Sequence, residues 1–101
     1  MKVLLIIPAY NEQENIEKTV KTIKNYSKDI DYIVINDGSK DNTPKILDEK
    51  NINHIDLVNN LGIGGAVQTG YKYAYENNYD IAIQFDGDGQ HDINCIDKII
   101  E

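Results

Sequence analysis

Four short apolar runs alternate with longer segments of helical periodicity, and this alternation constrains the fold of the chain more than any other feature. The runs cover residues 2–7, 32–35, 53–57 and 81–85. Strands that alternate with helices are joined by right-handed crossovers and form parallel sheets. We therefore predict an α/β domain with a Rossmann-like, mostly parallel sheet of about four strands and helices on both faces.

The first connecting segment shows the spacing of an amphipathic helix. Ile16, Val20 and Ile23 recur at helical intervals. Asn11 is a candidate N-cap, which would place Glu12 in the first turn, where the helix dipole favours anions. This segment is expected to cover one face of the sheet.

A glycine-rich stretch, NNLGIGG at residues 59–65, precedes another expected helix from about Ala66 to Asn77. Its expected packing face consists of Val67, Gly70, Tyr71 and Ala74. The stretch is neither a dinucleotide fingerprint nor a P-loop, because it lacks the third glycine position and the Gly-Lys-Ser/Thr end. It either presents a helix N-terminus to an anion or serves only as a strand-to-helix turn.

Composition excludes several functional classes. The 101 residues are enough for one small domain, and the net charge of −7 argues against a nucleic-acid partner. The lone Cys95 fits a reducing compartment, and no apolar run is long enough to cross a bilayer. We expect a cytoplasmic location. The last residues read as the beginning of a helix, so the chain looks like the front part of a longer protein.

Three of the apolar runs end in polar or acidic turns, namely residues 8–12, 36–39 and 86–88. The carboxyl ends of parallel strands emerge at one edge of a sheet, where open α/β folds bind their ligands. Each turn alone is ordinary turn chemistry, because Asn, Asp, Gly and Ser dominate turns. The three together predict a pocket at that edge.

Asp86 and Asp88 offer carboxylate oxygens to a hard cation such as Mg²⁺ or Mn²⁺. The alternatives are a solvated acidic turn and a module that binds a cation through the acids of residues 86–92 alone. An EF-hand is excluded, because His91 stands where that loop needs glycine and Asp97 where it needs glutamate.

Two further acids are candidate ligand-binding residues. Asp37 could accept hydrogen bonds from a nucleobase edge, or could form an Asx-turn or a helix cap. Glu12 could reach a ribose or a base, or could only complement a helix dipole.

Four motifs occur in order along nearly the whole chain: IIPAYNE, VINDGSKDNT, NLGIGGAVQTGYKYA and FDGDGQHD. Together they resemble the family 2 glycosyltransferases of the GT-A fold, in particular the branch that transfers sugars to polyprenyl or dolichyl phosphate and related bacterial cell-surface polysaccharide enzymes. Asn36 departs from the pattern, since many members carry a second aspartate there.

The resemblance implies that residues 1–101 form a single nucleotide-diphospho-sugar-binding domain. It implies a metal-binding pair, Asp86 and Asp88, that holds Mg²⁺ or Mn²⁺ on the donor diphosphate. The nucleotide-binding residues that it implies are Pro8, Ala9, Tyr10, Glu12, Asp37, Gly62, Gly65 and Asp86.

The reaction implied by the resemblance is inverting transfer from a UDP- or GDP-sugar to a saccharide or lipid-phosphate acceptor. The catalytic base is expected beyond Glu101, so the isolated chain is expected to be inactive, and the full-length protein could associate with a membrane. A homodimer through an exposed sheet edge is also expected. The competing hypothesis is a non-catalytic nucleotide- or cation-binding or scaffold domain.

Overall fold

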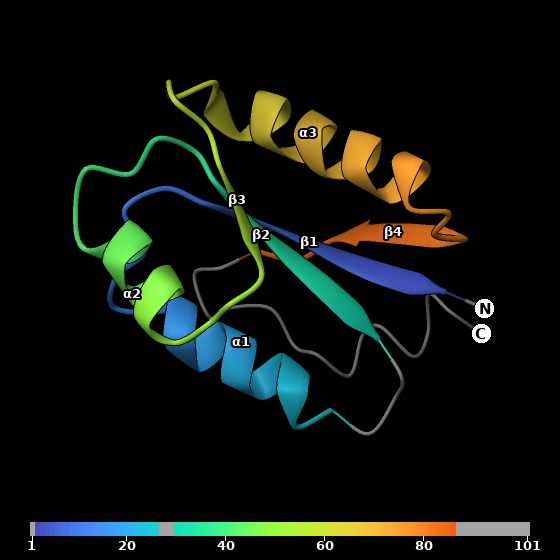
Figure 1. Ribbon diagram of the computed structural model, residues 1–101, viewed down its shortest axis with the longest axis horizontal. Coiled ribbons are helices and arrows are strands. Elements are labelled where there is room, and N and C mark those ends of the chain that lie inside the picture. Colours follow the sequence, from blue (N-terminus) through green and yellow to red (C-terminus); the bar gives the residue numbers. More distant parts are fainter. Residues whose placement is uncertain (1, 27–29, 87–101) are drawn as a thin grey trace.

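The computed structural model describes residues 2–26 and 30–86, and these form a four-stranded sheet in which every pair of neighbouring strands is parallel (Figure 1). The strand order is β3-β2-β1-β4. The strands are β1 (Val3–Ala9), β2 (Asp31–Asn36), β3 (His54–Asp56) and β4 (Ile81–Gln84). The predicted α/β class is confirmed, and the helix expected at the end of the chain lies outside the described residues.

Helices cover both faces of the sheet, as the sequence predicted. The helices are α1 (Ile16–Lys24), α2 (Thr43–Glu49) and α3 (Gly62–Glu76). In Figure 1, α3 lies on one side of the strands, and α1 and α2 lie on the other. None of the described helices is long and apolar enough to span a bilayer.

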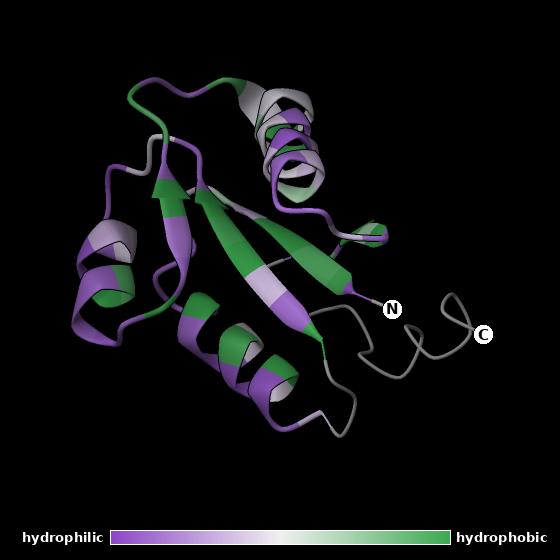
Figure 2. Ribbon diagram, turned by 45° about the vertical axis from the view of Figure 1, so that its right-hand side comes forward, coloured by the Kyte–Doolittle hydropathy of each residue, from purple (hydrophilic) through white to green (hydrophobic). Residues whose placement is uncertain are grey.

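The central strand β1 explains why its sequence is continuously apolar. Leu5 and Ile7 pack with the buried residues of α1 and α2, whereas Leu4 and Ile6 pack with those of α3. All four side chains are fully buried. Successive residues of a strand point to opposite faces, so a strand that is covered on both sides needs apolar residues at every position. Figure 2 shows this apolar character along β1 and in the middle of β2, whose first residue, Asp31, is hydrophilic.

The predicted N-cap at Asn11 is wrong, because α1 begins five residues later, at Ile16. Asn11 has a left-handed backbone with φ of 55°, a conformation that asparagine tolerates better than most residues. Its side-chain Oδ1 accepts the backbone N–H of Lys40 at 2.8 Å. Residues 10–14 therefore form a loop at the sheet edge, and Glu12 belongs to that loop.

Helix α3 begins at Gly62, four residues earlier than predicted. Its buried face consists of Ala66, Gly70 and Ala74, spaced by four residues. Gly70 and Ala74 were predicted correctly. The prediction was wrong for Tyr71, which is 46% exposed, and Val67 is only partly buried. A Cβ at position 70 would overlap the side chain of Ile6, so the glycine allows α3 to lie close to β1.

Candidate functional site

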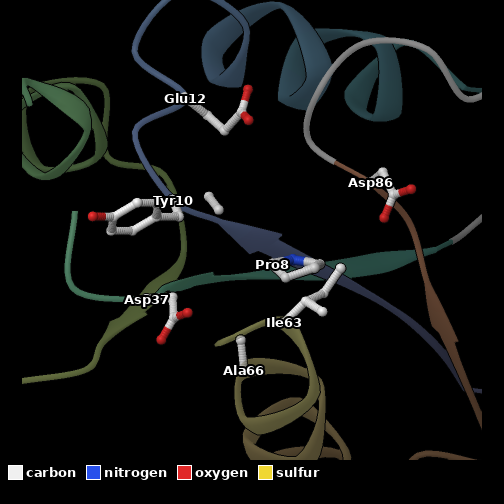
Figure 3. A pocket seen from close by; sticks show the side chains of 8 residues that line it. Pro8, Tyr10, Glu12, Asp37, Ile63, Ala66 and Asp86 are labelled. Carbon is white, nitrogen blue, oxygen red and sulfur yellow. The ribbon is translucent and has the colours of Figure 1, made fainter. Parts of the chain in front are cut away.

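The predicted turns meet at the carboxyl edge of the sheet, where they line a pocket of about 250 Å³ (Figure 3). Of the eight predicted nucleotide-binding residues, six line this pocket and two, Gly62 and Gly65, do not. The lining residues are Pro8, Ala9, Tyr10, Glu12, Asp37, Ile63, Ala66 and Asp86.

Ile63 and Ala66 were missed because the beginning of α3 was predicted too late. Three residues apart, they lie on one side of the first turn of the helix, and both reach the pocket. Gly62 instead adopts a φ of 80°, and its N–H donates to Asn60 Oδ1 at 3.0 Å. Gly65 faces Leu61, whose Cβ would lie 2.5 Å from a Cβ at position 65.

The strand order places two acids of the pocket on either side of β1. Asp37 follows β2 and Asp86 follows β4, and β1 lies between these two strands. Figure 3 accordingly shows Asp37 and Asp86 on either side of Pro8. Asp86 is kept in line with the sheet because Phe85 N–H donates to Ile6 O at 2.8 Å and extends the pairing of β4 with β1. A ligand that touched both acids would cross the end of β1.

The loop that carries Tyr10 and Glu12 is held by the segment that follows β2, namely the loop between β2 and α2 and the first residue of α2. Side-chain oxygens accept backbone N–H groups in both directions between the two loops. The bonds run from Asn11 N to Ser39 Oγ (3.0 Å), Glu12 N to Thr43 Oγ1 (3.0 Å), Gln13 N to Asp41 Oδ2 (3.3 Å), Lys40 N to Asn11 Oδ1 (2.8 Å) and Asn42 N to Gln13 Oε1 (3.0 Å).

Asp41 carries two of the contacts that order this pair of loops. Its Oδ1 accepts the backbone N–H of Thr43 at 2.9 Å, and its Oδ2 accepts that of Gln13. Burial raises the pKa of Asp41, but hydrogen bonds from Thr43 and Gln13 outweigh that effect and lower the pKa below its ordinary value of 3.8. Asp41 therefore remains ionised and contributes to the shape of the pocket wall without lining it.

Asp37 is the most buried acid of the pocket, with 3% of its surface exposed. Its backbone N–H donates to Ala9 O at 2.8 Å, and its Oδ1 accepts the backbone N–H of Leu61 at 2.7 Å. The carboxylate thus connects the end of β2 to the beginning of α3. The sequence allowed an Asx-turn for Asp37, but the side chain that accepts a backbone N–H within this turn is that of its neighbour, since Asn36 Oδ1 accepts the N–H of Ser39 at 3.2 Å.

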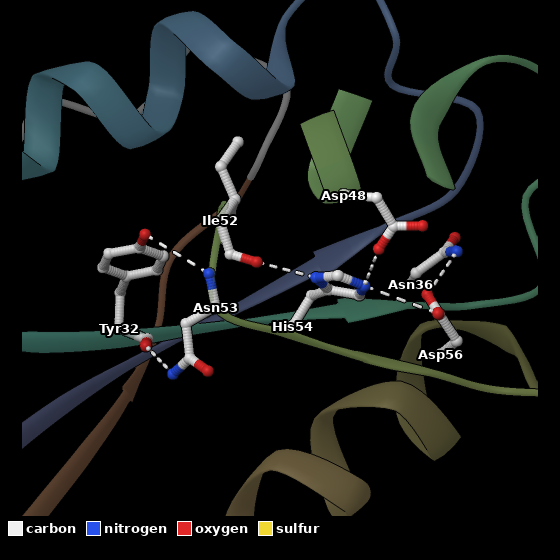
Figure 4. A network of polar contacts seen from close by, with 7 residues as sticks. All are labelled: Tyr32, Asn36, Asp48, Ile52, Asn53, His54 and Asp56. Carbon is white, nitrogen blue, oxygen red and sulfur yellow. Dashed lines mark hydrogen bonds and ion pairs between the residues drawn. The ribbon is translucent and has the colours of Figure 1, made fainter. Parts of the chain in front are cut away.

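The amide of Asn36 also explains why this position differs from the aspartate that is common in the motif that the sequence resembles. Its Nδ2 donates to Asp56 Oδ1 at 2.9 Å, a bond that a second aspartate could not donate (Figure 4). The other oxygen of Asp56 lies 3.4 Å from Nε2 of His54, and Nδ1 of that ring lies 2.7 Å from Ile52 O. These contacts fix β3 beside the turn that carries Asp37.

The predicted metal pair is only partly described. Asp86 lines the pocket, and its Oδ1 accepts a hydrogen bond from Gln84 Nε2 at 3.1 Å, whereas Asp88 lies outside the described residues. No group of three or more metal-ligating side chains is found within residues 2–26 and 30–86. Magnesium sites commonly use only one or two carboxylates and complete the octahedron with phosphate oxygens and water, so Asp86 fits such a site.

Comparison with known proteins decides the family. The profile described as Glycosyl transferase family 2 matches residues 4–101. The chain belongs to glycosyl transferase family 2. This confirms the family inferred from the four motifs, which are spread over the same residues.

Relatives of this family 2 chain include polyprenyl-phosphate sugar transferases, in agreement with the predicted branch. A UDP-N-acetylglucosamine–dolichyl-phosphate N-acetylglucosaminyltransferase of Methanococcus voltae is 41% identical over 98% of the chain and 46% of the relative. An undecaprenyl-phosphate mannosyltransferase of Micrococcus luteus is 28% identical over the whole chain and 44% of the relative. The chain spans less than half the length of these relatives.

Solved structures show the same fold. The solved chain of S. aureus TarS 1–349 matches with a TM-score of 0.80 at 19% identity, over 99% of this chain and 31% of that one. The mannosyltransferase PcManGT of Pyrobaculum calidifontis, solved with GDP-Man and Mn²⁺, matches with a TM-score of 0.74 at 24% identity, over 86% of the chain and 27% of its own. At these identities the likeness concerns the fold alone, and it confirms the predicted GT-A type.

Proposed function

We propose that residues 1–101 form a nucleotide-diphospho-sugar-binding domain whose pocket holds the donor. The observation that carries this proposal is the pocket at the end of β1, with an acid from β2 at one end and an acid from β4 at the other. Its apolar walls, supplied in part by Tyr10, Ile63 and Ala66, suit the flat face of a base or a ribose. In this proposal the base lies toward Asp37 and the diphosphate lies toward Asp86.

The charge of the pocket supports a divalent cation as part of the site. Three lining residues are carboxylates, Glu12, Asp37 and Asp86, and none of the eight is cationic. Residues 1–101 contain no arginine, so they offer no bidentate arginine clamp of the kind that many proteins use on phosphates. A diphosphate would be repelled from these carboxylates unless a cation lay between them. We propose that Asp86, with Asp88, holds Mg²⁺ or Mn²⁺, which would neutralise the diphosphate as a leaving group.

The proposed reaction of the full-length protein is inverting sugar transfer. An acceptor oxygen, from a lipid phosphate or a saccharide hydroxyl, attacks the anomeric carbon on the side opposite the diphosphate. The bond from that carbon to the diphosphate breaks, and the nucleoside diphosphate leaves. The names of the dolichyl- and undecaprenyl-phosphate relatives support a lipid-phosphate acceptor, and hence work at a membrane surface. The catalytic base is expected beyond Glu101, so the isolated chain should bind the donor without transferring its sugar.

Calorimetric titration with UDP and with GDP, each with and without Mn²⁺, tests the donor site. We expect nucleotide binding that requires the metal, and an Asp86→Asn or Asp88→Ala variant should weaken it by at least about tenfold. Glu76→Gln, on the exposed side of α3, is the matched control and should bind as the unaltered chain does. A folded sample without metal-dependent nucleotide binding would contradict the proposal. Metal binding that is indifferent to nucleotide would support the cation-binding module instead.

We also propose that the chain self-associates through β4. In the described part of the chain, β4 pairs only with β1, and its residues Ile81, Ala82 and Ile83 are apolar and partly buried. An apolar strand with one open edge offers unpaired N–H and C=O groups to another strand. Sedimentation should therefore show a dimer whose population rises with concentration, and a monomer at every concentration would contradict this.

A further inference from the structure

The ring of His54, at the beginning of β3, has acceptor groups next to both of its nitrogens (Figure 4). Nδ1 lies 2.7 Å from Ile52 O. Nε2 lies 3.3 Å from Asp48 Oδ1 and 3.4 Å from Asp56 Oδ2. Only 16% of the histidine side chain is exposed. Because Asp48 belongs to α2 and Asp56 ends β3, the ring joins these two elements.

The neighbours of the ring determine which hydrogens it carries. A backbone carbonyl only accepts hydrogen bonds, so Nδ1 must carry a hydrogen toward Ile52 O. An ionised carboxylate also only accepts, so Nε2 must carry a hydrogen toward Asp48 and Asp56. A neutral imidazole has a single N–H, and the lone pair of its Nε2 would face two anions. The imidazolium is therefore the form of the ring that satisfies every recorded contact.

Both charged groups recorded at this ring are acids. On β2, the residue paired with His54 is Val34, which is apolar and buried. Lys50 is the basic residue nearest to the histidine in the sequence, but its Nζ pairs with Glu17 Oε2 at 3.5 Å. In the described part of the chain, the ring is the one cationic group recorded against Asp48 and Asp56. Loss of its charge would leave both carboxylates without a cationic partner.

Asp56 connects the ring to the donor pocket. Its other oxygen, Oδ1, accepts the side-chain N–H of Asn36 at 2.9 Å. Asn36 directly precedes the pocket acid Asp37, and its own Oδ1 accepts the N–H of Ser39 at 3.2 Å. The hydroxyl of Ser39 in turn holds the loop that forms another wall of the pocket. A displacement of Asp56 would thus reach two walls of the pocket.

We propose that His54 is a positioning residue whose imidazolium form clamps α2 to β3, so that the pocket binds its nucleotide more tightly when the ring is charged. The ring does not line the pocket and acts through Asp56 and Asn36. Because the bonded form is the charged one, its contribution is present at low pH and is lost as the pH rises through the titration of the ring. Histidine ordinarily changes charge between about pH 5 and 8. The step from clamp to pocket rests on the proposed donor-binding function, whereas the charge and tautomer of the ring do not.

Two-bond ¹H–¹⁵N NMR reads the protonation of the ring directly in the purified protein without nucleotide. The sequence has two histidines, so the His54 signals are those that a His91→Gln variant retains and a His54→Gln variant loses. At low pH both ring nitrogens should carry hydrogen. At high pH only Nδ1 should, which is the tautomer that free histidine disfavours in water. A neutral ring that keeps its hydrogen on Nε2 would overturn the proposal.

A change of charge on α2 tests the electrostatic part of the clamp. Asp48→Asn preserves the shape of the side chain but removes one anion from the ring, so Nε2 should lose its hydrogen at a lower pH than in the unaltered protein. Glu49→Gln is the matched control. It removes the same charge at the next position, where the carboxylate lies 3.9 Å from Lys45 Nζ, and it should leave the titration of the ring nearly unchanged. Equal titrations in the two variants would contradict the clamp.

Nucleotide affinity connects the ring to the pocket. UDP and GDP are titrated with Mn²⁺ into the unaltered protein and into His54→Gln, whose side chain keeps an N–H but does not titrate. The affinity of the unaltered protein relative to the variant should fall about threefold as the pH rises, the size expected of partly exposed ion pairs. This ratio cancels the titration of phosphate and of other acids, which both proteins share.

A ratio that stays constant with pH would overturn the link between His54 and the pocket. Absence of nucleotide binding at every pH would refute the donor site and this link together, and the NMR titration would still decide whether the charged clamp exists. If His54→Gln fails to fold, the affinity ratio of Asp48→Asn to Glu49→Gln replaces it, and the absence of any dependence on pH would contradict the link.

Discussion

At the scale of single residues, the pocket depends on hydrogen bonds made by side chains that do not line it. Glu12 reaches the pocket from a loop, not from a helix, and that loop lacks the internal hydrogen bonds of regular secondary structure. Ser39, Asp41 and Thr43 supply the missing partners for its backbone N–H groups. These bonds from outside the loop set the position of a pocket wall.

Thr43 provides a direct test of this role. Its side chain is fully buried, and its Oγ1 accepts the N–H of Glu12 at 3.0 Å. A Thr43→Val variant keeps the shape but removes the acceptor, so the free energy of unfolding should fall by about 1–3 kcal/mol. Urea denaturation measures this, and nucleotide affinity should fall with it. The control is Thr43→Ser, which keeps the hydroxyl. Equal losses for valine and serine would assign the effect to packing of the methyl group.

Asp41 predicts a dependence of stability on pH. Because hydrogen bonds lower its pKa in the folded protein, its contribution to stability is present above the ordinary value of 3.8 and is lost as the pH falls through the lowered value. Asp41→Asn should therefore be less stable than the unaltered chain at neutral pH, and the difference should shrink on acidification below 3.8. Urea titrations at a series of pH values would show it, and a constant difference would contradict the assignment.

At the scale of elements, the closeness of α3 to the sheet positions Ile63 and Ala66 in the pocket. The close contact occurs at Gly70, which faces Ile6 of β1. A larger residue there would push the helix away from the strands. The small residues of this face thus serve packing and site geometry together.

Two glycines of the same helix separate packing from helix propensity. Gly70→Ala should lower the free energy of unfolding by about 1–3 kcal/mol because the added methyl group would overlap Ile6. Gly64→Ala meets nothing within 4 Å and should raise it by up to about 1 kcal/mol, since alanine favours helix. Urea denaturation of both variants is the measurement. A stabilised Gly70→Ala protein would mean that the interface relaxes without cost.

At the scale of the whole molecule, the edge of the sheet opposite the pocket is closed by a polar cluster. Tyr79 precedes β4, and its hydroxyl donates to Asp31 Oδ2 at the beginning of β2, at 2.7 Å. Lys2 Nζ lies 4.4 Å from the centre of the same ring, and the Lys2 backbone N–H donates to Asp80 Oδ2 at 2.7 Å. These contacts link segments that are far apart in the chain.

Tyr79 makes this closure sensitive to alkali. Burial raises its pKa to about 12, with the hydrogen bond to Asp31 as a further cause, from an ordinary value of 10.0. The unfolded chain would lose that proton first, so stability should decline as the pH rises from about 10 toward 12. Tyr79→Phe should remove this part of the decline. Tyr75→Phe, at an exposed position, is the control and should not. Equal alkaline profiles for the two variants would contradict the role of Tyr79.

The sequence alone was sufficient for the architecture. Apolar runs, helical spacing and strand-end turns are local patterns, and the rule that parallel strands end at one edge converts them into a pocket containing Pro8, Asp37 and Asp86. The motif resemblance then identified the family correctly. Two predictions failed because a local pattern does not record contacts with distant segments. Asparagine is a residue type that often caps helices, but the side chain of Asn11 accepts the backbone N–H of Lys40. Tyr71 has the spacing of a buried residue, but it lies on the exposed flank of α3.

What the sequence determined by itself was the order of elements, the acids at the strand ends and the family to which the chain belongs. Only the tertiary structure decided which distant backbone groups those acids bond. Leu61 lies 24 residues from Asp37, and no local pattern predicts that its N–H meets Oδ1 at 2.7 Å. The physical reason is that a hydrogen bond between distant segments depends on the packing of whole loops against each other, and this packing is set by contacts such as that of Gly38 with Asn60.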